Sequence, residues 1–302
     1  DVAEGVRVFT PYLKNKGPAY KQPLKRELKR DPIADFKNVT VKYRAVKGEP
    51  PKIFDDFSLQ IGKGEKIALI GSNGAGKSTM LKLMMGLIRP ESGQVLLNGR
   101  AAADLPKEEL GRTFSLVYQN PEEMFIKDSI RKDIEYAMMV RKVEDYQKRT
   151  DELLEMFRLT DLQDRDGRLL SGGQMRRASL AIGIALQPEI LLLDEPTANL
   201  DIATRREIMK TLQLLKGITD TVVIATHDMQ LVCDWAERLI VLSAGYVIAD
   251  GTKEEIFADM YVRQQVGIRP PQICDMGRAL GIENPCFTID EFMEYFRGEK
   301  YA

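Results

Sequence analysis

One stretch decides the fold of this chain: IALIGSNGAGKST, residues 67–79. Its four leading apolar residues predict a short buried strand, and the pattern from Met80 to Met85 predicts a helix after the loop. The residues between them follow the spacing G-x-x-x-x-G-K-[ST], from Gly71 to Ser78. Strand, glycine-rich loop and helix in this order predict an α/β fold with a phosphate-binding loop of the Walker A type.

This loop predicts a site for ATP and Mg²⁺. Its glycines let successive backbone N–H groups turn toward phosphates, and the helix start adds the positive end of its dipole. Lys77 would reach the β- and γ-phosphates, Ser78 would ligate Mg²⁺, and Thr79 could donate to the α-phosphate. The predicted nucleotide contacts of the loop are Ser72, Asn73, Gly74, Ala75, Gly76, Lys77, Ser78 and Thr79.

A pair of carboxylates follows another apolar segment. Residues 189–193 predict a parallel strand covered on both faces, since the run is too short to span a membrane. Asp194 and Glu195 come directly after it, where open α/β sheets usually bind ligands. We expect Asp194 to hold Mg²⁺ through water, and Glu195 to be the catalytic group that orients and polarises the attacking water.

A second glycine-rich helix start, Ser-Gly-Gly-Gln, occupies residues 171–174. Ser171 is the predicted N-cap, and the glycines after it leave backbone N–H groups uncovered. Since one Walker A loop already saturates one triphosphate, we expect this start to contact the γ-phosphate of a nucleotide on a different subunit. The predicted contacts are Ser171, Gly172, Gly173 and Gln174.

The run from Leu170 to Gln174 resembles the signature of ATP-binding-cassette (ABC) ATPases, and four other elements match that family in order. Tyr43 resembles the aromatic residue that stacks on adenine. Gln119 resembles the catalytic glutamine that senses Mg²⁺ and the γ-phosphate, and His227, the only histidine, resembles the switch histidine. The loop around Asn199 resembles the one that crosses the dimer seam, although smaller residues are commoner there.

The resemblance covers about residues 33–257 and implies the family's fold. That fold is an α/β P-loop NTPase domain of the ABC type, expected here over residues 33–260, with an antiparallel β subdomain. A helical subdomain is expected at about residues 120–170, where apolar residues from 129 to 158 have helical spacing. Residues 261–302 would form a C-terminal helical tail that helps two ATPases pair, with a capping box at Thr288 and Glu291.

Within the family, the chain is most similar to energy-coupling factor (ECF) ATPases, which serve vitamin or metal-ion importers. Residues 119–125, QNPEEMF, resemble their Q-N-P-D-D-Q-x-F stretch. The resemblance implies a second ABC ATPase, a transmembrane coupling subunit and a membrane substrate-binding subunit as partners. It also implies a peripheral position on the cytoplasmic face of the membrane. We expect Met124 and Phe125 to be exposed and to contact a membrane subunit.

Composition narrows the function further. The chain has 302 residues, with 44 basic and 45 acidic side chains and a formal net charge of −1. This balance gives no basic bias toward nucleic acid, so no nucleic-acid partner is expected. The sequence has no apolar run of membrane-spanning length and no signal-peptide pattern. Its three cysteines share no metal spacing and are expected to be reduced cytosolic thiols.

Residues 1–32 match no element of the cassette. Four prolines and a basic cluster between Lys21 and Arg30 predict an extended basic linker or arm. The chain begins with Asp1, and we expect that it is either processed or cut from a longer protein. If the chain is cut from a longer protein, residues 1–32 would join this cassette to a preceding one.

Three alternatives remain open at this stage. The closest is the ATPase of another ABC importer, which would have the same chemistry but different membrane contacts. A soluble ABC protein acting on the ribosome or on nucleic acid is the second, and the basic residues of 1–32 favour it. The third is a small-molecule P-loop kinase, which would have no use for the segment from Ser171 to Gln174.

Overall fold

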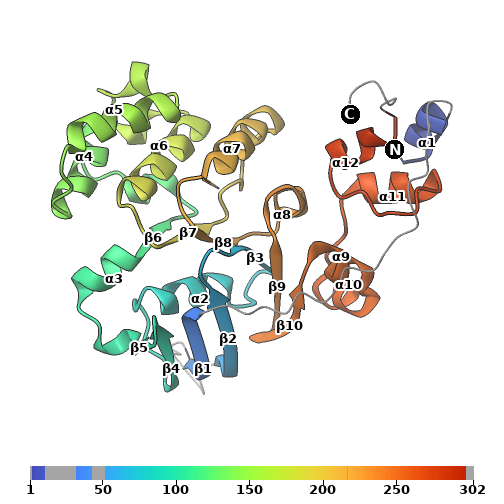
Figure 1. Ribbon diagram of the computed structural model, residues 1–302, viewed down its shortest axis with the longest axis horizontal. Helices are drawn as coiled ribbons and strands as arrows, with labels where there is room; N and C mark the ends of the chain where they lie inside the picture. Colours follow the sequence, from blue (N-terminus) through green and yellow to red (C-terminus); the bar gives the residue numbers. More distant parts are fainter. Residues whose placement is uncertain (1, 11–31, 43–51, 216, 297–302) are drawn as a thin grey trace.

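The structure is a computed structural model that describes residues 2–10, 32–42, 52–215 and 217–296. Within these residues the chain forms a larger and a smaller β-sheet (Figure 1). One group of helices lies beyond the β6 and β7 edge of the larger sheet, and a second group at the end of the chain lies beyond the β9 and β10 edge. The predicted α/β class is confirmed.

The larger sheet has the strand order β10-β9-β3-β8-β7-β6. Its strands are β3 (Lys66–Gly71), β6 (Phe114–Val117), β7 (Ile190–Asp194), β8 (Thr221–Ala225), β9 (Arg238–Ser243) and β10 (Tyr246–Gly251). β10 runs antiparallel to β9, whereas β9, β3, β8, β7 and β6 pair in parallel. Every residue of β3 and β8 is buried, which explains their unbroken apolar runs. Because β3, β8 and β7 are parallel neighbours, the loops after them meet at one edge.

The smaller sheet is antiparallel, with the order β2-β1-β4-β5. Its strands are β1 (Pro32–Lys42), β2 (Lys52–Gly62), β4 (Ser92–Leu97) and β5 (Arg100–Ala101). Phe54 and Phe57 of β2 share a hydrophobic core with Met80 of helix α2 (Lys77–Met84). The smaller sheet therefore covers the helix that follows the glycine-rich loop.

Three helices pack together after Gln119: α4 (Ile130–Val140), α5 (Tyr146–Met156) and α6 (Gly172–Ala185). Ile134, Leu154 and Leu180, one from each helix, belong to one buried cluster. Helices α4 and α5 lie within residues 120–170, where the helical subdomain is expected, whereas α6 lies beyond that range. The bounds of this subdomain, and the bounds 33–260 and 261–302, remain predictions. Two shorter helices, η2 (Ala102–Asp104) and α3 (Lys107–Thr113), precede Gln119. The shorter helices between Gln119 and α6 are η3 (Pro121–Met124), η4 (Thr160–Leu162) and η5 (Gly167–Leu169).

The expected exposure of Phe125 is wrong. Its ring is only 6% exposed and packs against Gly167, where a Cβ atom would lie 2.3 Å from the ring. Met124 is also partly buried in the same core. The exposed apolar side chain of this segment is the next residue, Ile126, which is 68% exposed. The aromatic ring is buried because η3 turns it toward η5, a contact that residue spacing could not reveal.

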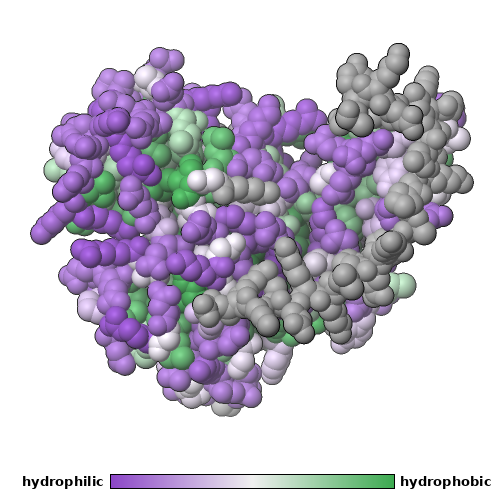
Figure 2. All heavy atoms as spheres, in the orientation of Figure 1, coloured by the Kyte–Doolittle hydropathy of each residue, from purple (hydrophilic) through white to green (hydrophobic). Residues whose placement is uncertain are grey.

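Two further helices, α7 (Ile202–Leu215) and α8 (Met229–Trp235), follow strands β7 and β8. The buried indole of Trp235 donates a hydrogen bond to the carbonyl of Leu212 at 3.1 Å, which joins the two helices. None of the helices in the described part of the chain has the length and apolar character to cross a membrane. Figure 2 shows a mostly hydrophilic surface, with hydrophobic side chains gathered near α4 and α6.

The end of the chain forms four helices: α9 (Lys253–Ala258), α10 (Met260–Val266), α11 (Gln272–Ala279) and α12 (Ile289–Glu294). The predicted capping box is confirmed, because the N–H of Glu291 donates to the Thr288 hydroxyl and the N–H of Thr288 donates to the Glu291 carboxylate. The three cysteines are free and buried, and burial raises the pKa of the Cys286 thiol to about 11. Their thiols are therefore unreactive.

The N-terminal segment differs from the expected extended arm. Residues Val2–Phe9 form a helix, α1, that packs against α11. Phe9 contacts the rings of Phe292 and Phe296, each at a centroid distance of 5.5 Å. The apolar face of α1 precedes the first proline of the chain, so a helix is possible there. The basic cluster that suggested a linker lies in residues 11–31, outside the described part of the structure.

Candidate nucleotide site

The glycine-rich loop lies between β3 and α2, at the centre of the larger sheet. Gly76 is the N-cap of α2 and has φ +105°, a conformation that favours glycine. A Cβ atom on Gly76 would also lie 2.7 Å from the ring of Phe54. The tight turn therefore requires glycine, and it leaves the first N–H groups of α2 uncovered for an anion.

Lys77 is the first residue of α2 and is buried beneath the loop. Its Nζ atom donates to the carbonyls of Gly71 at 2.8 Å and Ser72 at 3.3 Å. These bonds hold the ammonium group inside the loop, next to the uncovered N–H groups. The loop thus presents a fixed positive charge to any phosphate that it encloses.

Ser78 and Asp194 lie side by side, although 116 positions separate them in the sequence. Burial raises the pKa of the Asp194 carboxyl above its ordinary value, and a hydrogen bond with Ser78 opposes the rise. A hydroxyl and a carboxylate next to a phosphate loop are the oxygen ligands that suit Mg²⁺. Within the described residues no group of three or more His, Cys, Asp or Glu side chains could hold a metal alone.

Glu195 occupies a strained and buried position between β7 and β8. It has φ +47°, which is uncommon for a residue with a side chain, and it is 6% exposed. Its Oε2 atom accepts hydrogen bonds from the Thr226 hydroxyl at 3.1 Å and the His227 N–H at 3.3 Å. Its backbone N–H donates to the carbonyl of Ala225 at 2.8 Å. These bonds fix the carboxylate at the strand ends, and such strain is typical of functional positions.

His227 lies at the end of β8, next to the carboxylate. Its Nδ1 atom is 2.8 Å from Oε1 of Glu195, yet its side chain is 67% exposed. The ring is therefore anchored on one side and open to the pocket on the other. A ring in this position can change partners when an anion enters.

The predicted loop, carboxylate and histidine residues come together around a pocket of about 440 Å³. Ser72 and Ala75 belong to the same loop, joined by a 3.1 Å backbone hydrogen bond. Tyr43 lies outside the described residues. The pocket is lined by Ile53, Asn73, Gly74, Gly76, Lys77, Ser78, Thr79, Gln119, Asp194, Glu195 and His227.

Sequence reasoning missed the residues that support this site. Thr226 bonds to Glu195 and also accepts the Asp228 N–H at 3.0 Å. The Asp228 carboxylate in turn accepts the Thr197 hydroxyl at 2.8 Å. The sequence did offer a signal for Thr226, because it is a polar residue between a β-branched strand and the histidine. Ile53 gave no signal, because only the position of the smaller sheet brings it to the pocket.

The second helix start lies apart from this pocket. Ser171 is the N-cap of α6, and Gln174 Oε1 accepts its backbone N–H at 3.0 Å, so the predicted cap is confirmed. Gly172 lines a different pocket of about 410 Å³, together with Gln119 and Asn199. Asn199 has φ +59°, a conformation that asparagine tolerates better than most residues. One chain therefore does not bring the two glycine-rich starts to a single pocket.

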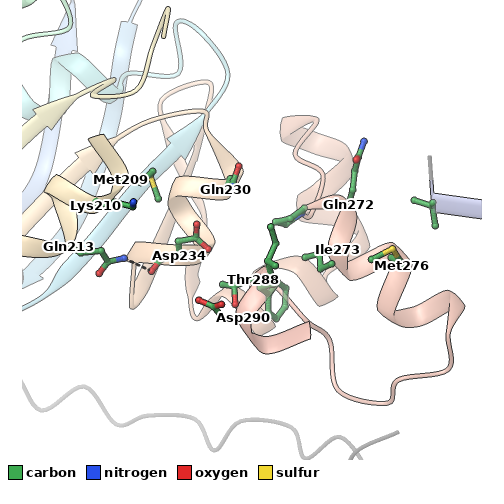
Figure 3. A pocket seen from close by; sticks show the side chains of 14 residues that line it. Met209, Lys210, Gln213, Gln230, Asp234, Gln272, Ile273, Met276, Thr288 and Asp290 are labelled. Atoms are coloured by element: carbon green, nitrogen blue, oxygen red, sulfur yellow. Dashed lines mark hydrogen bonds between the residues drawn. The ribbon is translucent and has the colours of Figure 1, made fainter. Parts of the chain in front are cut away.

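A larger cavity in the described part of the chain lies elsewhere, between α7 and α8 on one side and α11 and α12 on the other (Figure 3). It measures about 890 Å³, and its lining includes Met209, Ile273 and Met276. Burial raises the pKa of Asp234 in this cavity to about 6. Since its lining contains no glycine-rich loop, size alone does not identify the phosphate site.

Comparison with known proteins identifies the family of this chain. The family model described as ABC transporter matches residues 54–198. The chain is 35% identical over 238 residues to the cobalt import ATP-binding protein CbiO of Rhodobacter capsulatus, covering 78% of this chain and 85% of that protein. It is 34% identical over 274 residues to the energy-coupling factor transporter ATP-binding protein EcfA1 of Caldanaerobacter subterraneus, covering 87% and 98%.

A solved structure gives the same result for the fold. The dimeric post-hydrolysis state of the ATP-binding cassette MJ0796, bound to ADP and Pi, superposes with a TM-score of 0.65 at 30% identity. The match covers 72% of this chain and 98% of that chain. The chain therefore belongs to the ABC transporter family and is an ATPase subunit whose ATP hydrolysis is coupled to transport.

Proposed function

We propose that this ATPase energises an importer of the energy-coupling factor type, for a vitamin or a metal ion. Two such cassettes would enclose two ATP molecules, each between the glycine-rich loop of one subunit and the Ser171 segment of the other. The separate positions of the two helix starts in one chain support this arrangement most directly. The similarity to CbiO and EcfA1 supports the importer type.

In the proposed site, the loop N–H groups and Lys77 bind the phosphates, and Thr79 donates to the α-phosphate. Tyr43 stacks on adenine. Ser78, Gln119 and Asp194 hold Mg²⁺, which would neutralise charge on the β- and γ-phosphates when bound. The contact between Ser78 and Asp194, and the place of Gln119 on the same pocket, support this set of ligands.

Glu195 is the proposed catalytic base, and its hydrogen bonds suggest how it is controlled. Thr226 and the His227 N–H hold Oε2, while the His227 ring holds Oε1. When the exposed ring turns to a γ-phosphate, Oε1 loses that partner and becomes free to accept a proton from water. The same movement would thus sense the γ-phosphate and release the base.

The Ser171 to Gln174 segment is proposed to close the site of a second ABC subunit. The uncovered N–H groups at the start of α6 would bind the γ-phosphate held by the partner. The dimeric structure of MJ0796 with ADP and Pi supports pairing of such cassettes. The partner is either a second copy of this chain or a different cassette.

We further propose that the cassette lies on the cytoplasmic face of a membrane and binds a transmembrane coupling subunit. Ile126 and Leu169 are exposed by 68% and 82%, and they follow the buried contact between Phe125 and Gly167. Arg168 also donates to the carbonyl of Lys127 at 3.4 Å, which keeps the two segments together. Two exposed apolar side chains on adjoining turns form a surface that a partner could cover.

Co-purification tests the importer type. Tagged chain, extracted from its native membrane in mild detergent, should retain a transmembrane coupling subunit and a small membrane-embedded substrate-binding protein. Other membrane partners would instead identify another ABC importer. Salt-sensitive retention of RNA or ribosomes, with no membrane protein, would favour the soluble alternative and contradict the proposal.

A further inference from the structure

Arg176 joins the two glycine-rich regions through the backbone of Gln119. It is the fifth residue of α6 and is only 3% exposed. Its Nη1 atom donates to the carbonyl of Tyr118 at 2.9 Å, and its Nη2 atom donates to the carbonyl of Gln119 at 2.8 Å. One planar guanidinium group therefore links the helix that begins at Ser171 to the residue that lines the nucleotide pocket.

The charge of this side chain is not balanced by a carboxylate in the described part of the chain. Burial alone lowers the pKa of Arg176, and its Nε atom is buried without a hydrogen-bond partner among those residues. A buried cation without a counter-charge has a desolvation cost, which hydrogen bonds to two neutral carbonyls offset only in part. Stability therefore does not explain why an arginine stands here.

Gln119 lies where the two pockets meet. It lines the nucleotide pocket together with Lys77 and Glu195, and it lines the second pocket together with Gly172 and Arg176. Two hydrogen bonds from one rigid guanidinium group restrain both distance and orientation. A movement of the Gln119 backbone toward a bound nucleotide would therefore displace the start of α6, and the reverse would also hold.

We infer that Arg176 is a positioning residue that couples the two half-sites of one chain. It transmits the position of Gln119, next to the chain's own nucleotide, to the Ser171 segment, which completes the site of the partner. The inference rests on the proposed sharing of sites between subunits. It adds that one guanidinium group makes the two sites of a dimer interdependent.

Three variants isolate this role. Arg176→Met removes the fork and the unpaired charge at similar length, so the melting temperature should stay close to that of the parent protein. Arg176→Lys keeps a charged donor but loses the planar fork, and it should recover part of the function. Arg177→Met is the matched control, because the next residue of α6 only approaches Glu207 at 4.0 Å.

Mixed dimers of the full chain test the coupling. A loop donor carries Ser171→Arg and keeps its glycine-rich loop, and a signature donor carries Lys77→Ala and keeps its Ser171 segment. Neither homodimer has a complete site, whereas their mixture has one. Recovery of ATP turnover in the mixture would confirm sharing between two copies of this chain, and no recovery would contradict sharing between two copies without reference to Arg176.

Arg176→Met is then added to either donor. We expect kcat of the mixture to fall about 10- to 100-fold in both placements, as displaced reacting groups commonly cause, with KM changed less than about threefold. Arg176→Lys should give intermediate rates, and Arg177→Met should give the rate of the unmodified mixture. A loss in only one placement, no loss in either, or a loss that follows a lowered melting temperature and is not partly restored by lysine would overturn the inference.

Discussion

The starts of α2 and α6 are both glycine-rich, with uncovered backbone N–H groups, but they have different surroundings. The start of α2 follows a central strand of the sheet, so Asp194, Glu195 and His227 at neighbouring strand ends surround it. The start of α6 belongs to the helical group, and its pocket contains neither a lysine nor this pair of carboxylates. A glycine-rich helix start offers uncovered N–H groups that suit an anion, whereas its place in the sheet decides which side chains surround that start.

The largest effect should come from Glu195→Gln, which tests the chemistry at the start of α2. The amide keeps the shape of the side chain but cannot accept a proton, so ATP turnover should fall by about 10²- to 10⁴-fold. ATP binding should persist, and a closed dimer should accumulate during size-exclusion chromatography with ATP and Mg²⁺. Turnover at the parent rate would show that Glu195 is not the base.

Ser171→Arg tests whether the start of α6 acts on another subunit. The bulky side chain would block the uncovered N–H groups, so turnover should fall about 100-fold, within the range known for loss of anion-stabilising donors. Nucleotide affinity of the isolated subunit should change less than about twofold, because the loop after β3 is intact. Calorimetric titration that showed lost binding would contradict the separation of the two sites.

Lys77→Ala tests phosphate binding at the start of α2. Removal of the ammonium group should weaken ATP binding by about 10- to 100-fold, the usual range for a lost hydrogen bond to a charged group. Fluorescent nucleotide titration measures the change, and thermal unfolding checks the loop, because Lys77 also bonds to Gly71 and Ser72. Unchanged ATP affinity would contradict the proposal that this loop binds the phosphates.

The smallest effect should come from Asp234→Asn in the large cavity. This cavity lies outside both helix starts, so the variant is a control for them. The folded state raises the pKa of Asp234 from 3.8 to about 6, so it binds this proton more tightly than the unfolded chain does. Stability is therefore lost as pH rises from about 4 to 6, and the cost persists at pH 7. Asp234→Asn should stabilise the protein at pH 7 by about 1–2 kcal/mol, allowing for water around the half-buried carboxylate.

The gain from Asp234→Asn should shrink toward pH 4, and urea unfolding across this range measures it. ATP turnover should be unchanged, because Asp234 lies among the residues of the large cavity rather than of the nucleotide pocket. A large fall in turnover would show that the cavity affects catalysis, and would contradict the assignment of the chemistry to the nucleotide pocket alone.

Local patterns in the sequence predicted those features that depend on a few consecutive residues. The strand before Gly71, the N-cap at Ser171 and the capping box at Thr288 are present as expected. Each is fixed by short-range periodicity or by hydrogen bonds within one turn. The α/β class and the ABC family also followed, because the motifs occur in order along the chain.

The wrong and missing predictions concern contacts between distant segments. Phe125 is buried by a turn near Gly167, and residues Val2–Phe9 form a helix that packs on the tail. Thr226 and Arg176 act through partners that are 31 and 57 or 58 positions away. No local pattern indicates such pairs, because the distances become short only after the strands are ordered in the sheet.

The sequence by itself predicted two glycine-rich helix starts with uncovered N–H groups, because backbone conformation there depends on the residues of each turn. The tertiary structure alone decided which start receives carboxylates and a histidine, and which remains open. The physical reason is that parallel strand order brings Asp194, Glu195 and His227 to the loop before Lys77, while α6 leaves Ser171 beside a separate pocket.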